Sequence, residues 1–101
     1  MSQQQLVEEY HPPKKEDIGT RIVPGKYTIL RVYFDLVGGY GEVVNIESEE
    51  GKFYTFSKVL RKQLTEMIAE YESIQGETVD GFLRQPIRVE VKQVKNYLTL
   101  V

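Results

Sequence analysis

One segment with helical periodicity, residues 57–72, stands late among segments with strand character, and this order constrains the fold more than any other feature. Its apolar side chains recur at three- and four-residue spacings, which gather them on one face of a helix. They are Leu60, Leu64, Met67, Ile68 and Tyr71. Ser57 can cap the helix, because its hydroxyl can accept a hydrogen bond from a backbone N–H. Three strand-like segments precede the helix and two follow it, which predicts a mainly β fold with one helix.

The strand-like segments are rich in Tyr, Phe, Ile and Val and are separated by glycine- or proline-containing turns. We expect strands over residues 26–36, 40–47, 52–56, 87–93 and 97–101. Residues 76–85 are expected to form a loop whose Phe82 and Leu83 pack under the barrel, with Pro86 opening the next strand. Gly38 and Gly39 are typical of a hairpin turn, where glycine tolerates positive φ.

Alternation along these strands predicts which side chains share a face, because successive residues of a strand point to opposite sides. Strict alternation over 26–36 puts Thr28, Leu30, Val32 and Phe34 on one face, and Tyr27, Ile29, Arg31 and Tyr33 on the other. Inward positions elsewhere are Val44, Ile46, Ile87, Val89, Val91, Leu98 and Leu100. Both faces of the segment 26–36 are largely apolar or aromatic, which suits a strand that bends across a barrel.

The order of three strands, one helix and two strands is that of an OB-fold, a five-stranded barrel that often binds oligonucleotides or oligosaccharides. We expect an OB-like barrel domain over residues 21–101, preceded by a flexible arm over residues 1–20. The arm contains Pro12 and Pro13 and mixed charges that cannot build a core. Its apolar residues Leu6, Val7 and Tyr10 can dock on the domain or on a neighbouring subunit.

Composition limits the class of protein. A chain of 101 residues, 41% hydrophobic, suits one domain with a modest core. The absence of Cys excludes disulfides, thiolate chemistry and Cys-based zinc sites. No apolar run approaches the ~20 residues that span a bilayer, and the polar start carries no apolar signal core. We expect a cytosolic or intravirion location and no membrane partner.

The formal net charge of −2 opposes nucleic-acid binding, because phosphate contacts require Lys or Arg. The distribution of charge reduces this objection. Residues 52–62 contain four basic residues and no acid, and residues 84–101 contain four against the single acid Glu90. These basic residues are Lys52, Lys58, Arg61, Lys62, Arg84, Arg88, Lys92 and Lys95. Mixed surface charge that merely keeps a small domain soluble explains the same pattern.

No catalytic or metal-binding motif stands out, so we expect neither an enzyme nor a cofactor. His11 is the only histidine and lies beside two prolines, without a fixed partner for general base catalysis. One His, no Cys and scattered acids form a poor metal-ligand set. The glycines at 38, 39 and 41 lack the Lys-Ser/Thr and the following helix of a phosphate-binding loop.

Aromatic and basic residues form the best functional constellation. Phe53, Tyr54 and Phe56 crowd one short strand between Lys52 and Lys58. Tyr54 and Phe56 share one face and Phe53 the other, so one set fills the core and the other can lie on the surface. Exposed rings offer stacking platforms for unpaired bases, worth about 1–3 kcal/mol per base. Strands also favour Tyr and Phe for packing alone, so a purely structural role remains open.

Four short motifs lie in the stretch from Gly25 to Val101: GKYTIL at residues 25–30, YG at 40–41, FYTFS at 53–57 and NYLTL at 96–100. With these motifs the stretch resembles small OB-fold single-stranded-DNA-binding proteins. It implies a barrel that coats unpaired DNA in replication, repair or recombination, often as an oligomer. The small, Cys-free chain suits a viral, phage or archaeal accessory protein.

The sequence therefore favours non-catalytic binding of single-stranded DNA or RNA without strong sequence preference. The predicted stacking residues are Tyr33, Tyr40, Tyr54 and Phe56, and the predicted phosphate contacts are Arg31, Lys52, Lys58, Arg61, Lys92 and Lys95. Tyr97 lies on a strand that can approach them. The alternative is a protein–protein module, structural or accessory in a virus or multi-subunit complex. It would form homo-oligomers through the arm or a strand edge, and the net acidity favours it.

Overall fold

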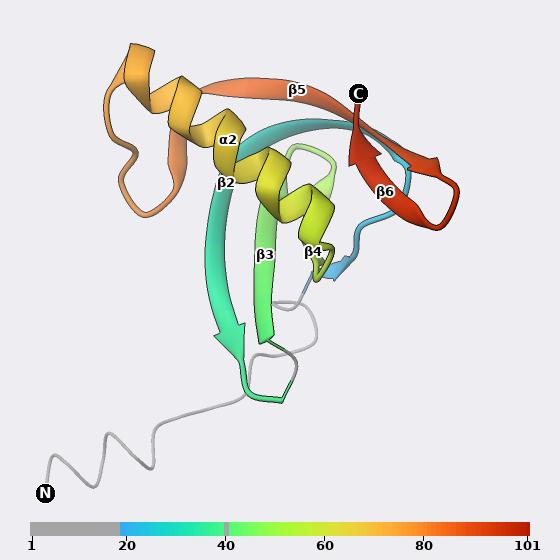
Figure 1. Ribbon diagram of the computed structural model, residues 1–101. Coiled ribbons are helices and arrows are strands. Elements are labelled where there is room, and N and C mark those ends of the chain that lie inside the picture. The colour runs from blue at the N-terminus through green and yellow to red at the C-terminus, as the bar shows by residue number, and fades with distance from the viewer. Residues whose placement is uncertain (1–18, 40) are drawn as a thin grey trace, which may run out of the picture.

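The computed structural model describes residues 19–39 and 41–101 and is a six-stranded sheet curled around one helix (Figure 1). Its elements are β1 (Thr20–Arg21), β2 (Gly25–Val37), β3 (Gly41–Ser48), β4 (Gly51–Thr55), α2 (Lys58–Gln75), β5 (Phe82–Val94) and β6 (Tyr97–Leu100). The order across the sheet is β1-β4-β3-β2-β5-β6. The prediction of a mainly β fold with one helix is confirmed, with six described strands in place of five.

The additional strand, β1, lies at the boundary predicted between arm and barrel. Thr20 and Arg21 pair in parallel with Phe53 and Tyr54 of β4. The neighbouring Ile22 is 3% exposed and belongs to the core. Within the described residues, β4 pairs with β1 and β3, and β6 pairs with β5, so the sheet is a half-barrel. The predicted arm otherwise lies outside the described residues.

The long strand β2 belongs to both halves of the sheet, and its pairing register changes in its middle. Its first part, from Gly25, pairs antiparallel with β5, and its second part, to Val37, pairs antiparallel with β3. A register shift between Ile29 and Arg31 marks the change. Such an irregularity bends a strand and increases its twist. The sheet therefore curls at β2 (Figure 1).

The same shift overturns the strict alternation predicted for β2. Tyr27 and Ile29 are buried, as is Val32, whereas Thr28 and Leu30 are only half-buried. The extra residue at the shift moves the inward set from odd to even positions. Tyr27, Ile29 and Val32 consequently pack into one core, and the predicted grouping of Val32 with Thr28 and Leu30 is wrong.

The helix α2 fits the prediction closely. Ser57 caps it, and the Ser57 hydroxyl accepts a hydrogen bond of 3.1 Å from the N–H of Leu60. Leu60 and Leu64 are essentially inaccessible to solvent, and Met67 and Ile68 pack against the core. The helix therefore covers the inner face of the sheet with the face that its periodicity predicts.

The strand β5 begins earlier than the sequence indicates. It starts at Phe82, inside the expected loop, and it contains Pro86 rather than opening on it. Phe82 pairs with Arg31 and Ile87 with Ile29, and Pro86 lies between these two paired positions. A proline is tolerated where the ladder is interrupted, since it donates no hydrogen bond. Phe82 is 50% exposed, so its expected burial is wrong, whereas Leu83 packs against the core.

Candidate functional site

Four side chains form a row across the outer face of the sheet, opposite the core. Tyr33 of β2 is directly opposite Asn45 of β3, and Asn45 is opposite Tyr54 of β4. Arg21 of β1 is the parallel partner of Tyr54. Cross-strand partners point to the same face of a sheet. We call Tyr33, Asn45, Tyr54 and Arg21 the aromatic row.

The sequence left open whether Tyr54 or Phe53 lies inside, and the packing decides it. The Phe53 ring meets the buried Tyr27 ring at 4.9 Å between centroids, and Phe53 packs against the core. Thr55 is buried beside it. Because β4 alternates, Tyr54 is directed to the outer face. Tyr54, which is half-buried, therefore lies on the face of β4 opposite Phe53.

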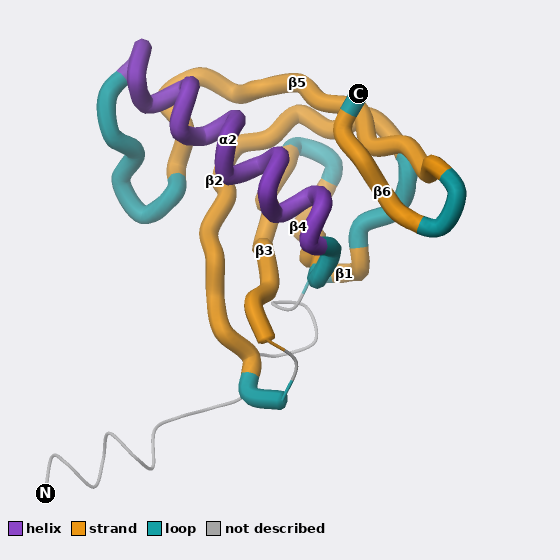
Figure 2. The backbone as a smooth tube through the Cα atoms, viewed as in Figure 1, coloured by secondary structure: helices purple, strands orange, loops and turns teal. Residues whose placement is uncertain are grey.

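A groove adjoins the aromatic row and is lined by residues of β1, of the turn from β4 into α2, and of the β5–β6 hairpin. Figure 2 shows where these three segments of the backbone lie. The polar and aromatic lining of the groove includes Arg21, Phe56, Lys58, Gln93, Asn96 and Tyr97, and no carboxylate lines it. Three other hollows in the described residues each contain acidic side chains. Of these four hollows, the groove is therefore the best suited to an anionic ligand.

Tyr54 joins the row to the groove. Its ring meets the Phe56 ring edge-to-face at 5.9 Å between centroids. The guanidinium carbon of Arg21 lies 5.9 Å from the centre of the Tyr54 ring, within cation–π range. The aromatic row and the groove thus form one continuous surface, which we call the aromatic–basic surface.

Several predicted site residues meet on this surface. Tyr33 and Tyr54 lie in the row, and Phe56 and Lys58 line the groove. Lys95 neighbours the groove residue Asn96 in the β5–β6 turn, where it has a φ of 55°. The predicted Tyr40 lies outside the described residues.

The other predicted cations lie elsewhere or are already engaged. Arg31 is ion-paired with Glu47 at 3.2 Å. Arg61 lies toward the inner side of the sheet, where it pairs with Glu42 at 2.9 Å. Lys52 is exposed opposite Glu47, and Lys92 is exposed on β5 opposite Thr99. The structure does not gather these four cations at the groove.

Sequence reasoning missed Arg21, Gln93 and Asn96 and left Tyr97 outside the selected set. Arg21 reaches the surface only because the two-residue strand β1 pairs with β4. Two residues carry no periodicity that could predict such a strand. The Gln93 amide donates to the carbonyl oxygen of Lys95 at 3.0 Å, which fixes the hairpin beside the groove.

In the part of the chain that the structure describes, no group of three or more His, Cys, Asp or Glu side chains is arranged to hold a metal ion. The predicted solvated loop residue His11 lies outside that part. None of the described helices is long and apolar enough to cross a membrane.

No protein-family model, curated protein or solved structure matches this chain. The class therefore rests on fold and surface: a small, mainly β domain with one helix and an aromatic–basic outer surface.

Proposed function

We propose that this protein is an OB-like barrel that binds single-stranded nucleic acid without catalysis. The observation that carries the proposal is the meeting of Tyr54, Phe56, Arg21 and Lys58 at one surface whose groove contains no carboxylate. Aromatic rings stack with the faces of unpaired bases and basic side chains contact phosphates. The partner is therefore single-stranded DNA or RNA.

The arrangement of strands supports the OB-like assignment. β2 bends to serve two half-sheets, and α2 lies between β4 and β5, as in an OB-fold whose first strand is β2. In such folds the second and third strands, with the loop between the fourth and fifth, bind the ligand. These correspond to β3, β4 and the β5–β6 hairpin, which border the aromatic–basic surface.

Asn45 adds a polar group between two rings. It lies between Tyr33 and Tyr54 in the row, one strand away from each. Neighbouring strands are about 4.8 Å apart, so the two tyrosines lie about 10 Å apart across the sheet. An extended single strand laid along the row can place bases on both rings. The edge of a base between the two rings can then form a hydrogen bond with the Asn45 amide. Duplex bases are stacked on one another, so their faces cannot reach the rings.

The net charge of −2 is compatible with this proposal because the acids are not at the groove. Two of the 13 basic residues and four of the 15 acidic residues precede Gly19, so residues 19–101 carry 11 of each. Affinity then depends on local placement of a few cations. We expect a modest and clearly measurable salt dependence.

A titration of the full chain with fluorescent oligonucleotides tests the proposal. Oligo-dT, oligo-rU and a duplex of equal length are compared at several salt concentrations. We expect binding of the single strands at low salt, and weaker binding of the duplex. Absence of single-strand binding at low salt would refute the proposal, and equal duplex binding would change the class of ligand.

The variant Tyr54→Ala locates the surface. Loss of one stacking platform should weaken oligo-dT binding about tenfold or more. Phe34→Ala is the matched control, since Phe34 is a 45%-exposed ring that lines a different, acidic hollow. Equal affinities of the two variants, with both folded by circular dichroism, would remove Tyr54 from the site.

A further inference from the structure

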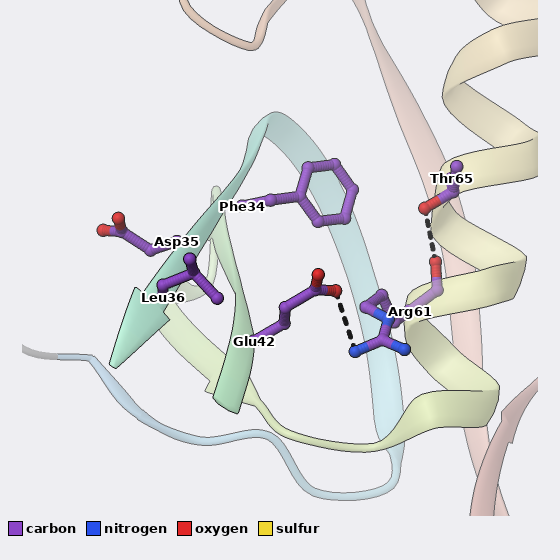
Figure 3. A pocket seen from close by; sticks show the side chains of 6 residues that line it. All are labelled: Phe34, Asp35, Leu36, Glu42, Arg61 and Thr65. Carbon is purple, nitrogen blue, oxygen red and sulfur yellow. Dashed lines mark hydrogen bonds and ion pairs between the residues drawn. The ribbon is translucent and has the colours of Figure 1, made fainter. Parts of the chain in front are cut away.

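A second exposed surface lies between the end of β2 and α2, on the face of the sheet that the helix covers only in part. Two adjoining hollows share Phe34 and Thr65 and form one trough. Phe34 and Leu36 of β2 point into the first hollow (Figure 3) and are 45% and 75% exposed. Val32 and Ile68 extend the apolar lining in the second. The trough thus leaves apolar side chains of the sheet uncovered by the helix.

The backbone beside this trough is also unpaired among the described residues. β2 pairs with β5 only as far as Arg31, and the N–H of Val32 then donates to the carbonyl of Gly81 at 3.0 Å. Alternate residues of a strand direct their N–H and C=O groups to the same edge. Phe34 and Leu36 therefore direct theirs to the edge where Val32 meets Gly81, and no described strand continues there. The same two residues offer apolar side chains and backbone hydrogen-bonding groups.

Carboxylates surround the trough. Asp35, Glu42, Glu72 and Asp80 line its two hollows. The one cation in the lining, Arg61, is already paired with Glu42 at 2.9 Å (Figure 3). This acidity disfavours nucleic acid. It also disfavours pairing with the same edge of a second copy, because like charges on facing strands destabilise a sheet.

We propose that the β2 edge at Phe34 and Leu36 binds an extended segment of a partner protein in which apolar residues alternate with Lys or Arg. Addition of a strand to an exposed edge derives affinity from main-chain hydrogen bonds and specificity from alternate side chains. The apolar side chains of the guest cover Phe34 and Leu36, and its cations face the carboxylates. Tyr33 lines the second hollow as well as belonging to the aromatic row, and the other residues that line the trough lie outside the aromatic–basic surface.

Synthetic peptides test the charge and backbone requirements with the full chain. The probe is an eight-residue peptide alternating Val with Lys, and its controls are a Val/Glu peptide and the Val/Lys peptide N-methylated at alternate residues. We expect binding of the first, at least tenfold weaker binding of both controls, and slower amide hydrogen exchange at Phe34 and Leu36 in the complex. Equal binding of the Val/Glu peptide would overturn the proposal.

A pair of variants tests the location. Leu36→Ser should weaken binding of the Val/Lys peptide about tenfold, and Ile74→Ser should leave it unchanged, since both side chains are 75% exposed but only Leu36 lines the trough. Unchanged binding by Leu36→Ser, or unchanged exchange at Phe34 and Leu36, would overturn the assignment. So would concentration-dependent dimerisation in sedimentation that Leu36→Ser abolishes, because the occupant would then be a second copy.

Discussion

The guanidinium carbon of Arg31 lies 4.2 Å from the centre of the Tyr33 ring, which places the cation over a predicted stacking residue. The same carbon lies 4.4 Å from the centre of the Phe82 ring. The Arg31 Nε donates to the Asp80 carbonyl oxygen at 2.7 Å, and its Nη1 to the Glu47 carboxylate at 3.2 Å. Arg31 thus joins β2, β3 and the start of β5, and this network leaves it poorly placed to meet a phosphate.

Replacement of this arginine should cost stability more than affinity. Arg31→Ala removes two cation–π contacts and two charge-assisted hydrogen bonds from a side chain that is 24% exposed. We expect the free energy of unfolding in urea to fall by about 1–2 kcal/mol. Arg88→Ala is the control, because Arg88 is exposed on β5. If Arg31→Ala instead weakens oligo-dT binding strongly at unchanged stability, the cation belongs to the ligand site.

A close approach of two backbones makes any larger residue at Gly81 destabilising. Its φ is 81°, and a Cβ there would overlap the carbonyl oxygen of Val32. Gly39 has a similar φ of 85° but open space around it. Gly39→Ala should cost about 1 kcal/mol from backbone strain alone. Gly81→Ala should cost about 3 kcal/mol, since the overlap adds to the strain. Similar urea midpoints for the two variants would contradict the overlap.

The sequence predicted the elements that depend on interactions between residues close together in the chain. The helix follows from the spacing of Leu60 and Leu64 and from the Ser57 cap, and alternation identified Val44 and Ile46 as core. The inward direction of Phe53 was one of two open choices, because alternation groups side chains without saying which face is buried.

Long-range pairing set the features that the sequence did not reveal. The register shift after Ile29 exchanges the two faces of β2, and it arises where one strand leaves β5 and joins β3. The parallel pairing of Arg21 with Tyr54 and the ion pair of Arg61 with Glu42 each join residues distant in sequence. The number of basic residues along the chain therefore overestimated the positive charge at the site, because Arg31 and Arg61 are already ion-paired with Glu47 and Glu42.

The Gln63 side chain connects α2 to the last strand, β6, by two hydrogen bonds. Its Nε2 donates to the Thr99 hydroxyl at 2.8 Å, and its Oε1 accepts from the N–H of Leu100 at 2.9 Å. Gln63→Leu should lower the free energy of unfolding by about 1–3 kcal/mol, since it leaves a partly buried N–H without its acceptor. Amide exchange at Leu100 should accelerate. The exposed Gln85→Leu serves as control, and unaltered exchange at Leu100 would show that β6 does not depend on this clamp.

Two lysines of α2 separate local phosphate contact from general charge. Lys58 lines the groove, whereas Lys62 is exposed one turn further along the helix and does not line it. Both replacements by alanine remove one positive charge. If Lys58 contacts a phosphate, Lys58→Ala should weaken oligo-dT binding and reduce the slope of log K against log salt by about 0.7, the value for one phosphate contact on a single strand. Lys62→Ala should leave the slope nearly unchanged. Identical slopes in the two variants would mean that net charge, rather than the groove, governs the interaction.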